Sequence, residues 1–222
     1  MKPRLFVDMD GTLAEWRNIK IVIEREEDAT HEEVMRRLDQ VLYSPRYYFH
    51  LRPQDNVVNA IRKIVREGEI EVYVLSCVKK DAFGQSPLAD KNAWLNKYLP
   101  EIDNEHRIFV PDGENKTLYI PGGIQPTDGL LDDYSKNLRE WAEAKANSAS
   151  LAIKLLNPVN SSYGTWTGNR VSYRLSPETI AAGVTDVVRS EGLQEVRHAD
   201  PDKDRTSISD TDFLNRLEEE EI

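Results

Sequence analysis

Two aspartates near the start of the chain are the residues best suited to chemistry. Asp8 and Asp10 stand two positions apart, between the apolar run 5–7 and Gly11. A short apolar run followed by glycine is typical of a buried strand that ends in a loop. Two carboxylates that converge there repel each other unless a cation or a shared proton lies between them. The spacing predicts a metal or proton-transfer site, with a simple turn as the alternative.

Further polar residues follow other apolar runs. Ser76 and Cys77 end the second run, Asp132 and Asp133 follow the fourth, and Lys116 lies in the loop before it. In a parallel α/β sheet the carboxyl ends of the strands meet at one edge, where ligands bind. Carboxylate and hydroxyl oxygens suit Mg²⁺, and a lysine supplies a point charge for a phosphate. The pattern therefore predicts Mg²⁺-dependent phosphate chemistry.

Five short apolar runs predict the strands that position these residues. The runs are continuous rather than alternating, which is typical of parallel strands covered on both faces. Helical patterns lie between them, so the sequence predicts a three-layer, doubly wound α/β fold with a parallel five-stranded sheet. The predicted strands are 4–7, 71–75, 107–110, 129–131 and 151–156, and the helical patterns lie at 57–65, 94–99, 138–142 and 180–188.

One segment interrupts the alternation of strand and helix. Residues 14–52 follow the first strand and carry a helix signal of their own, a possible capping box at Thr30 and Glu33. Apolar residues then recur on one helix face at Val34, Leu38, Val41 and Leu42. We therefore expect a small helical cap at 14–52, a catalytic core at 1–13 and 53–194, and an acidic, mobile tail at 195–222.

Composition limits the classes of function. The chain has 222 residues, 39% of them hydrophobic, which suits one α/β domain with an insertion. Its net charge of −10 argues against binding to a nucleic-acid polymer, and no apolar run approaches the ~20 residues of a membrane span. The acidic N-terminus is unlike a signal peptide, and the single cysteine excludes an internal disulfide framework. We expect a cytoplasmic monomer or homodimer.

Four groups of residues carry a resemblance to a known superfamily. In chain order they resemble the four motifs of the haloacid dehalogenase-like phosphatases: Asp8-x-Asp10-Gly11-Thr12, Ser76, Lys116 and Asp132-Asp133. Segments 44–53 and 87–98 resemble the 5′(3′)-deoxyribonucleotidase family within that superfamily. The resemblance covers roughly residues 4–156. It implies a sheet with strand order 5-4-1-2-3, in which the first strand is central.

The resemblance also implies a role for each site residue. Asp8 would be the nucleophile that forms an aspartyl-phosphate, and Asp10 would protonate the leaving oxygen and then activate water. The implied Mg²⁺ ligands are Asp8, Asp10 through its carbonyl, Asp133 and Asp132. The implied phosphate-binding groups are Ser76, Lys116 and backbone N–H groups near Gly11 and Cys77. The aromatic residues that would stack on a base or pack at the cap are Trp16, Tyr48 and Phe49.

The function implied is a Mg²⁺-dependent phosphomonoester hydrolase with a small phosphorylated substrate. Nucleoside monophosphates, including deoxy forms, are the leading substrates. One alternative is a small-metabolite or sugar phosphatase on the same scaffold, and another is a non-catalytic module that senses phosphate. Asp10 argues against the last alternative, because loss of this acid–base carboxylate is the simplest way to silence such a site.

Overall fold

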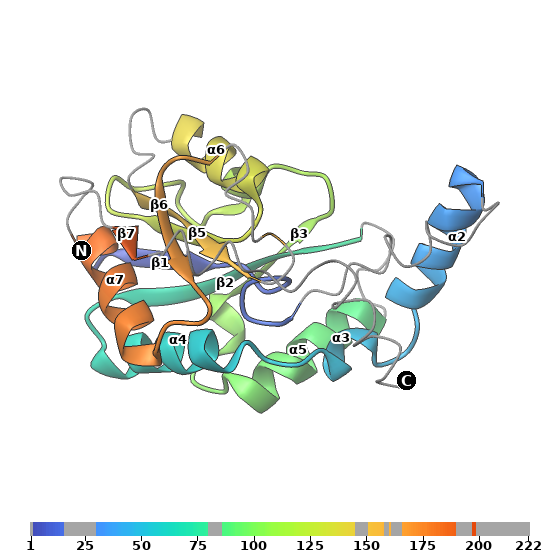
Figure 1. The fold of residues 1–222 in the computed structure, drawn as a ribbon, viewed down its shortest axis with the longest axis horizontal. Helices are drawn as coiled ribbons and strands as arrows, with labels where there is room; N and C mark the ends of the chain where they lie inside the picture. Colours follow the sequence, from blue (N-terminus) through green and yellow to red (C-terminus); the bar gives the residue numbers. More distant parts are fainter. Residues whose placement is uncertain are drawn as a thin grey trace.

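The computed structural model describes residues 2–15, 30–79, 86–144, 151–157, 160, 166–189 and 197–198. Its strands are all parallel and form one sheet in the order β3-β2-β1-β4-β5-β6-β7 (Figure 1). The expected order of the first five strands is confirmed, with the first strand between the second and the fourth. The strands are β1 (Arg4–Val7), β2 (Glu71–Val78), β3 (Arg107–Pro111), β4 (Gly129–Asp132), β5 (Ala152–Leu156), β6 (Asn169–Ser172) and β7 (Arg197–His198).

The prediction of five strands is wrong, because the sheet continues through β6 and β7. β6 contains a single strongly apolar residue, Val171, so it shows none of the apolar run that marks the other strands. Its pairing with β5 depends on backbone hydrogen bonds, which the pattern of side chains does not reveal. β7 pairs with β6 through Arg197 and His198, so the sheet extends into the segment predicted as a mobile tail.

Helices cover both faces of the sheet (Figure 1). α4, α5 and α7 lie on one face and α6 lies on the other, which confirms the three-layer arrangement. The described helices are α2 (His31–Leu42), α3 (Tyr47–His50), α4 (Asp55–Glu67), α5 (Ser86–Tyr98), α6 (Ser135–Ala144) and α7 (Pro177–Arg189), with short 3₁₀ turns η2 (Asn104–His106) and η3 (Lys116–Tyr119).

The central strand shows why the strand sequences are apolar throughout. Leu5 and Val7 of β1 belong to the core beneath α4, α5 and α7, whereas Phe6 belongs to the core beneath α6. The Phe6 ring lies 5.4 Å from that of Trp141 on α6. Because successive side chains of a strand point to opposite faces, a sheet covered on both sides buries residues 5–7 of its central strand on one face or the other. Burial of each such side chain contributes roughly 1.5–3 kcal/mol.

The helix ends follow local sequence signals. α4 ends at Gly68, which has a φ of 70° as the left-handed cap conformation requires. α7 begins after Ser176, whose hydroxyl accepts a hydrogen bond from the Thr179 N–H at 3.2 Å. The end of α4 and the beginning of α7, two helices that pack against each other, are therefore both set by residue types that favour a helix boundary.

α2 stands apart from the layered core, on the side toward which β2 runs (Figure 1). Thr30 caps it by accepting from the Glu33 N–H at 3.3 Å, but the Glu33 carboxylate pairs with Arg37 at 3.1 Å. Only the Thr30 half of the expected capping box is therefore observed. An ion pair between Asp39 and Lys79 connects α2 to the end of β2. Residues 16–29 of the predicted cap lie outside the described residues.

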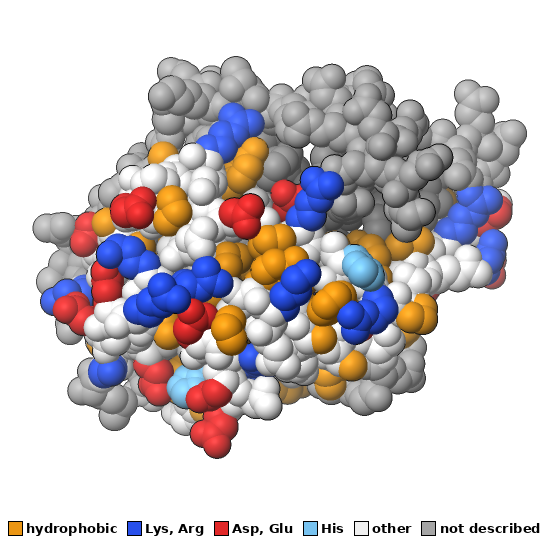
Figure 2. Space-filling model, turned by 90° about the horizontal axis from the view of Figure 1, so that it is seen from below, with side chains coloured by type: hydrophobic (Ala, Val, Ile, Leu, Met, Phe, Trp, Pro, Cys, Tyr) orange, Lys and Arg blue, Asp and Glu red, His pale blue; other side chains and the backbone are white. Residues whose placement is uncertain are grey.

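The surface formed by α4 and α5 is mixed in charge (Figure 2). Arg62 and Arg66 of α4 both pair with Glu101, at 3.1 and 3.0 Å. None of the helices in the described part of the chain has the length and apolar character needed to cross a membrane.

Candidate active site

The predicted site residues meet at the carboxyl edge of the sheet. Val7 of β1 pairs in register with Leu131 of β4 and with Val74 of β2. Asp8 and Asp132 therefore follow neighbouring strands at the same level, and Asp8 donates its backbone N–H to the Leu131 carbonyl at 2.9 Å. Parallel pairing thus brings together residues that are more than a hundred positions apart in sequence.

Lys116 joins the acids of β1 and β4. Its ammonium group donates to Asp8 Oδ1 at 2.6 Å and to Asp132 Oδ2 at 2.8 Å, and its side chain is buried. η3 places it there, because the Asn115 side chain caps this turn by accepting from the Thr117 N–H at 2.9 Å. Burial lowers the pKa of Lys116, but the charges of Asp132 and Asp8 outweigh that effect and raise it above its usual range. Lys116 is therefore a fixed positive charge within the acidic site.

Three carboxylates form a set of oxygen ligands. Asp8, Asp132 and Asp133 each offer an oxygen, and these atoms lie within 4.8 Å of one another. Burial raises the pKa of Asp8 to about 7 and that of Asp133 well above its usual range. Buried like charges at this separation need a cation between them, and three carboxylate oxygens suit a hard divalent ion. These residues therefore fit the divalent metal expected from the sequence.

Asp10 has a different environment, because its carboxylate forms an ion pair with Lys91 of α5. Lys91 is buried, with 1% of its side chain exposed, and it also donates to Ser76 Oγ at 3.0 Å and to the Cys77 carbonyl at 2.6 Å. The second Asp10 oxygen is buried and has no hydrogen-bond partner among the described residues. The two aspartates of the first loop are thus held by two separate lysines.

Lys91 is a site residue that the sequence analysis did not identify. It lies three and four positions before Trp94 and Leu95, which are both fully buried. A lysine in register with a buried apolar stripe must find a partner inside the protein, since an unpaired buried charge is very costly. That register is the signal that could have identified it.

Gly11 lies in the loop after β1, close to Asp133. Its N–H donates to the Ala14 carbonyl at 2.8 Å. The φ of Gly11 is 86°, and a Cβ atom there would lie 2.4 Å from Asp133 Oδ2. The absence of a side chain allows the Asp133 carboxylate to approach the first loop.

Cys77 lies beside Ser76 but is a poor nucleophile. Burial raises the pKa of its thiol to about 11, so the thiol remains protonated at neutral pH. Its contribution to the site is the carbonyl that accepts from Lys91.

The aromatic candidates occupy different surroundings. The Tyr48 ring is buried, and the Lys91 ammonium lies 4.8 Å from its centroid. The Phe49 ring instead packs against the Arg46 guanidinium at 3.7 Å. Trp16 lies outside the described residues. Of the two described rings, only Tyr48 contacts a group that itself contacts the predicted catalytic acids.

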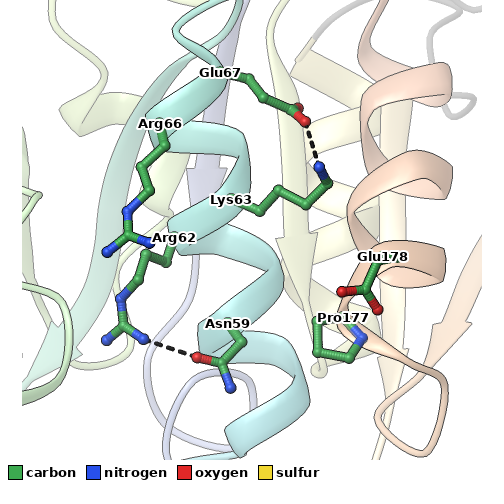
Figure 3. Close-up of a pocket in the computed structure, with 7 residues that line it drawn as sticks. All are labelled: Asn59, Arg62, Lys63, Arg66, Glu67, Pro177 and Glu178. Carbon is green, nitrogen blue, oxygen red and sulfur yellow. Dashed lines mark hydrogen bonds and ion pairs between the residues drawn. The ribbon is translucent and has the colours of Figure 1, made fainter.

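A hollow of about 580 Å³ lies elsewhere on the surface, between α4 and the start of α7 (Figure 3). Two interactions join residues that line it: Lys63 pairs with Glu67 at 2.7 Å, and Arg62 donates to Asn59 at 2.8 Å. None of the predicted site residues lines it. The hollow is therefore not the site of the chemistry described above.

The fold and the site together define a class of protein. A parallel α/β sheet with four aspartates and two lysines at one edge, in this order along the chain, is that of a haloacid dehalogenase-like phosphatase. A family model described as "5′ nucleotidase, deoxy (Pyrimidine), cytosolic type C protein" matches residues 2–163. The chain belongs to this family, and it is a hydrolase of the phosphatase class.

Solved structures resemble the chain in fold. A candidate β-phosphoglucomutase from Thermotoga maritima is 15% identical with a TM-score of 0.52, over 83% of this chain and 99% of that one. A candidate haloacid dehalogenase-like hydrolase from Burkholderia xenovorans LB400 is 14% identical with a TM-score of 0.48, over 87% and 100% of the two chains. The search of curated proteins gives no match. At such identity the first likeness indicates the fold alone.

Proposed function

We propose that this protein is a Mg²⁺-dependent phosphomonoester hydrolase that forms an aspartyl-phosphate on Asp8. Nucleoside 5′-monophosphates, including deoxy forms, are its proposed substrates, an assignment supported by the family match. The observation that carries the proposal is the separate pairing of the two aspartates: Lys116 contacts Asp8, and Lys91 pairs with Asp10. This separation supports the proposal that the Asp8 carboxylate is the nucleophile among the metal ligands, whereas the Asp10 carboxylate is the acid–base group.

In the first step, an Asp8 oxygen attacks phosphorus and the bond from phosphorus to the ester oxygen breaks. Asp10 donates a proton to the leaving oxygen and becomes a carboxylate, which Lys91 is placed to stabilise. In the second step, Asp10 takes a proton from water as that water attacks phosphorus. The bond from phosphorus to Asp8 then breaks, which releases inorganic phosphate and restores both aspartates.

The charges of the site account for its need for a cation. Four aspartates face two lysines, so two negative charges are left without a counterion before the substrate adds its own. Asp8, Asp132 and Asp133 would hold Mg²⁺, which would neutralise charge on the transferring phosphoryl group. Lys91 and Lys116 would bind the phosphoryl oxygens together with the Ser76 hydroxyl. The phosphate would thus be bound by groups from three different elements: α5, η3 and β2.

A turnover screen with Mg²⁺ tests this proposal most directly. The panel contains ribo- and deoxyribonucleoside 5′- and 3′-monophosphates, sugar phosphates and small metabolite phosphates. Highest kcat/KM on a nucleoside monophosphate is the expected result. Preference for a sugar or metabolite phosphate would favour the small-metabolite alternative, and phosphate binding without turnover would favour the sensing module.

We predict that chelation abolishes turnover and that Mg²⁺ restores it better than Ca²⁺. Mg²⁺ holds a near-octahedral shell of short oxygen bonds, whereas Ca²⁺ takes more ligands at longer distances and places the reacting groups less accurately. The measurement is the initial rate after dialysis against EDTA and after addition of each ion. Full activity in excess chelator would contradict the metal assignment.

The aromatic residues supply a prediction about the substrate. If Tyr48 stacks on a base, Tyr48→Ala lowers kcat/KM for a nucleoside monophosphate about tenfold or more, since stacking contributes ~1–3 kcal/mol per base. A small ester without a base, such as glycerol phosphate, loses less. Phe49→Ala is the matched control, because the Arg46 guanidinium already packs against that ring. Equal losses on both substrates in Tyr48→Ala would mean that the ring only packs on Lys91.

The proposal also covers the cap, the location in the cell and the oligomeric state of the enzyme. We infer that residues 14–52 form the cap, a view supported by the ion pair between Asp39 of α2 and Lys79 beyond the phosphate-binding end of β2. A cytoplasmic location suits the single cysteine, which is a free thiol. The protein would act as a monomer or homodimer.

A further inference from the structure

Two asparagines at the end of β5 bind each other. The Asn157 backbone N–H donates to Asn160 Oδ1 at 2.8 Å, and the Asn160 backbone N–H donates to Asn157 Oδ1 at 2.8 Å. These reciprocal bonds leave both side-chain NH₂ groups free to donate elsewhere. Asn157 is buried, with 2% of its surface exposed. The pair therefore forms a rigid source of two amide donors at the carboxyl edge of the sheet.

Both amides point their donors at the active-site loops. Asn157 Nδ2 donates to the Gly11 carbonyl at 2.6 Å and to Asp133 Oδ2 at 3.0 Å. Asn160 Nδ2 donates to the Asp133 carbonyl at 3.0 Å and to the Leu155 carbonyl at 2.8 Å. Asp133 is thus held by its carboxylate and by its backbone. The loop after β5 fixes the loops after β1 and β4 relative to each other.

The Asp133 carboxylate is confined by its close approach to Gly11 and by its hydrogen bond from Asn157. This carboxylate lies so close to Gly11 that a Cβ there would meet Asp133 Oδ2 at 2.4 Å. The same oxygen accepts from Asn157, whose Nδ2 also donates to the Gly11 carbonyl. Asp132 is held by three donors: Lys116, Asn137 and the Tyr134 N–H. For the Asp133 carboxylate, Asn157 is the one side-chain donor found among the described residues.

We propose that Asn157 is a positioning residue for metal binding, which sets the Asp133 carboxylate against Gly11, and that Asn160 holds Asn157 in place. The inference rests on the proposed function, because it assigns Asp133 to the metal. A metal site that depends on an outer hydrogen bond typically loses 10–100-fold in affinity when that bond is removed. Asn157 belongs to no strand-end motif of the family resemblance, and its position directly after β5 is its sequence signal.

The test is the Mg²⁺ affinity of the full-length, metal-free protein, measured by calorimetry without substrate. Asn157→Asp retains the shape and the oxygen that accepts from Asn160, but it removes the donor to Gly11 and Asp133. We expect both Asn157→Asp and Asn157→Ala to weaken the Kd for Mg²⁺ at least tenfold. Asn160→Ala is expected to weaken it less, because it disturbs Asp133 only through its backbone and through Asn157.

Asn56→Ala is the matched control. Asn56 Nδ2 also donates to a carbonyl distant in sequence, that of Tyr173 at 3.2 Å, but this bond involves neither Gly11 nor any of the site aspartates. Its Kd for Mg²⁺ is expected to equal that of the wild type. Thermal unfolding of each metal-free variant checks that it folds, and Asn157→Asp serves where Asn157→Ala does not fold.

Wild-type Mg²⁺ affinity in a folded Asn157→Asp or Asn157→Ala protein would overturn the inference, as would equal losses in Asn56→Ala. Absence of Mg²⁺ binding by the wild type would also overturn it. Mg²⁺ binding that falls as expected, in a protein that hydrolyses none of the phosphomonoester panel, would support the positioning role and contradict the proposed function. The two proposals are therefore judged by separate measurements.

Discussion

Asp8→Asn is expected to lower the turnover of every phosphomonoester by about a thousandfold or more, because an amide does not attack phosphorus as a carboxylate does. The variant retains an oxygen that can accept from Lys116, which stays paired with Asp132 at 2.8 Å. Turnover is measured at saturating substrate and Mg²⁺. Retention of a tenth or more of the wild-type rate would mean that Asp8 is not the nucleophile.

The control for this prediction is that the variant still folds. The raised pKa of Asp8 also predicts how the stability of the wild type, but not of the variant, depends on pH. Burial raises this pKa from 3.8 to about 7, so above pH 7 the folded, metal-free wild type carries a buried charge that destabilises it. As the pH falls from about 7 toward 3.8, the folded state takes up a proton that the unfolded chain does not, and wild-type stability rises. Asparagine has no such titration.

The variant should therefore be the more stable of the two proteins in chelator above pH 7. Because one pKa unit corresponds to about 1.4 kcal/mol, the difference is on the order of a few kcal/mol, and it should shrink as the pH is lowered toward 4. The measurement is denaturant unfolding of both proteins at a series of pH values. A variant less stable than the wild type at pH 8 would show that the Asp8 charge stabilises the empty site.

Residues at strand ends could be predicted from the sequence because parallel pairing places them together. Asp8, Ser76 and Asp132 each end a continuous apolar run, and the first five strands match those runs within a few residues. Lys116 lies on no strand, but its place in the loop before the predicted strand 129–131 made it a candidate, and the resemblance then implied its role. The position of each of these residues is defined by a strand that the apolar runs of the sequence predict.

The residues that were missed depend on contacts between elements. Lys91 lies on a helix and reaches Asp10, 81 positions away, through a buried side chain that periodicity alone treats as part of an apolar stripe. Asn157 directly follows the predicted strand 151–156, but that position does not specify its bond to Gly11, 146 positions away. Strand β6 was not predicted for a similar reason, because its pairing depends on the backbone of β5. Local sequence does not specify such distant partners.

Lys91→Met is expected to lower kcat/KM by about a hundredfold or more while the protein still folds. Methionine is of similar length and suits the buried position, so the change removes the charge and the three donated bonds with little change of volume. The transition state loses a cation at the phosphoryl group, and removal of one such electrostatic group commonly costs 10²–10³ in rate. The Asp10 carboxylate formed by proton donation also loses its counterion.

Lys97→Met is the matched control, because Lys97 lies on the same helix but contacts only the Phe49 and Tyr98 rings among the described residues. Its kcat/KM is expected to stay within about twofold of the wild-type value, as for most surface substitutions. Thermal unfolding of both variants separates a loss of fold from a loss of charge.

The leaving group of the substrate distinguishes the two effects of Lys91. If Lys91 stabilises the Asp10 carboxylate that forms on proton donation, its removal lowers the rate on esters whose leaving oxygen needs a proton far more than on p-nitrophenyl phosphate, whose leaving group needs none. If Lys91 only binds phosphate, both kinds of ester lose the same factor. A Lys91→Met protein with wild-type kcat/KM would mean that the ion pair with Asp10 is structural, and that Lys116 and the metal suffice to bind the phosphoryl group.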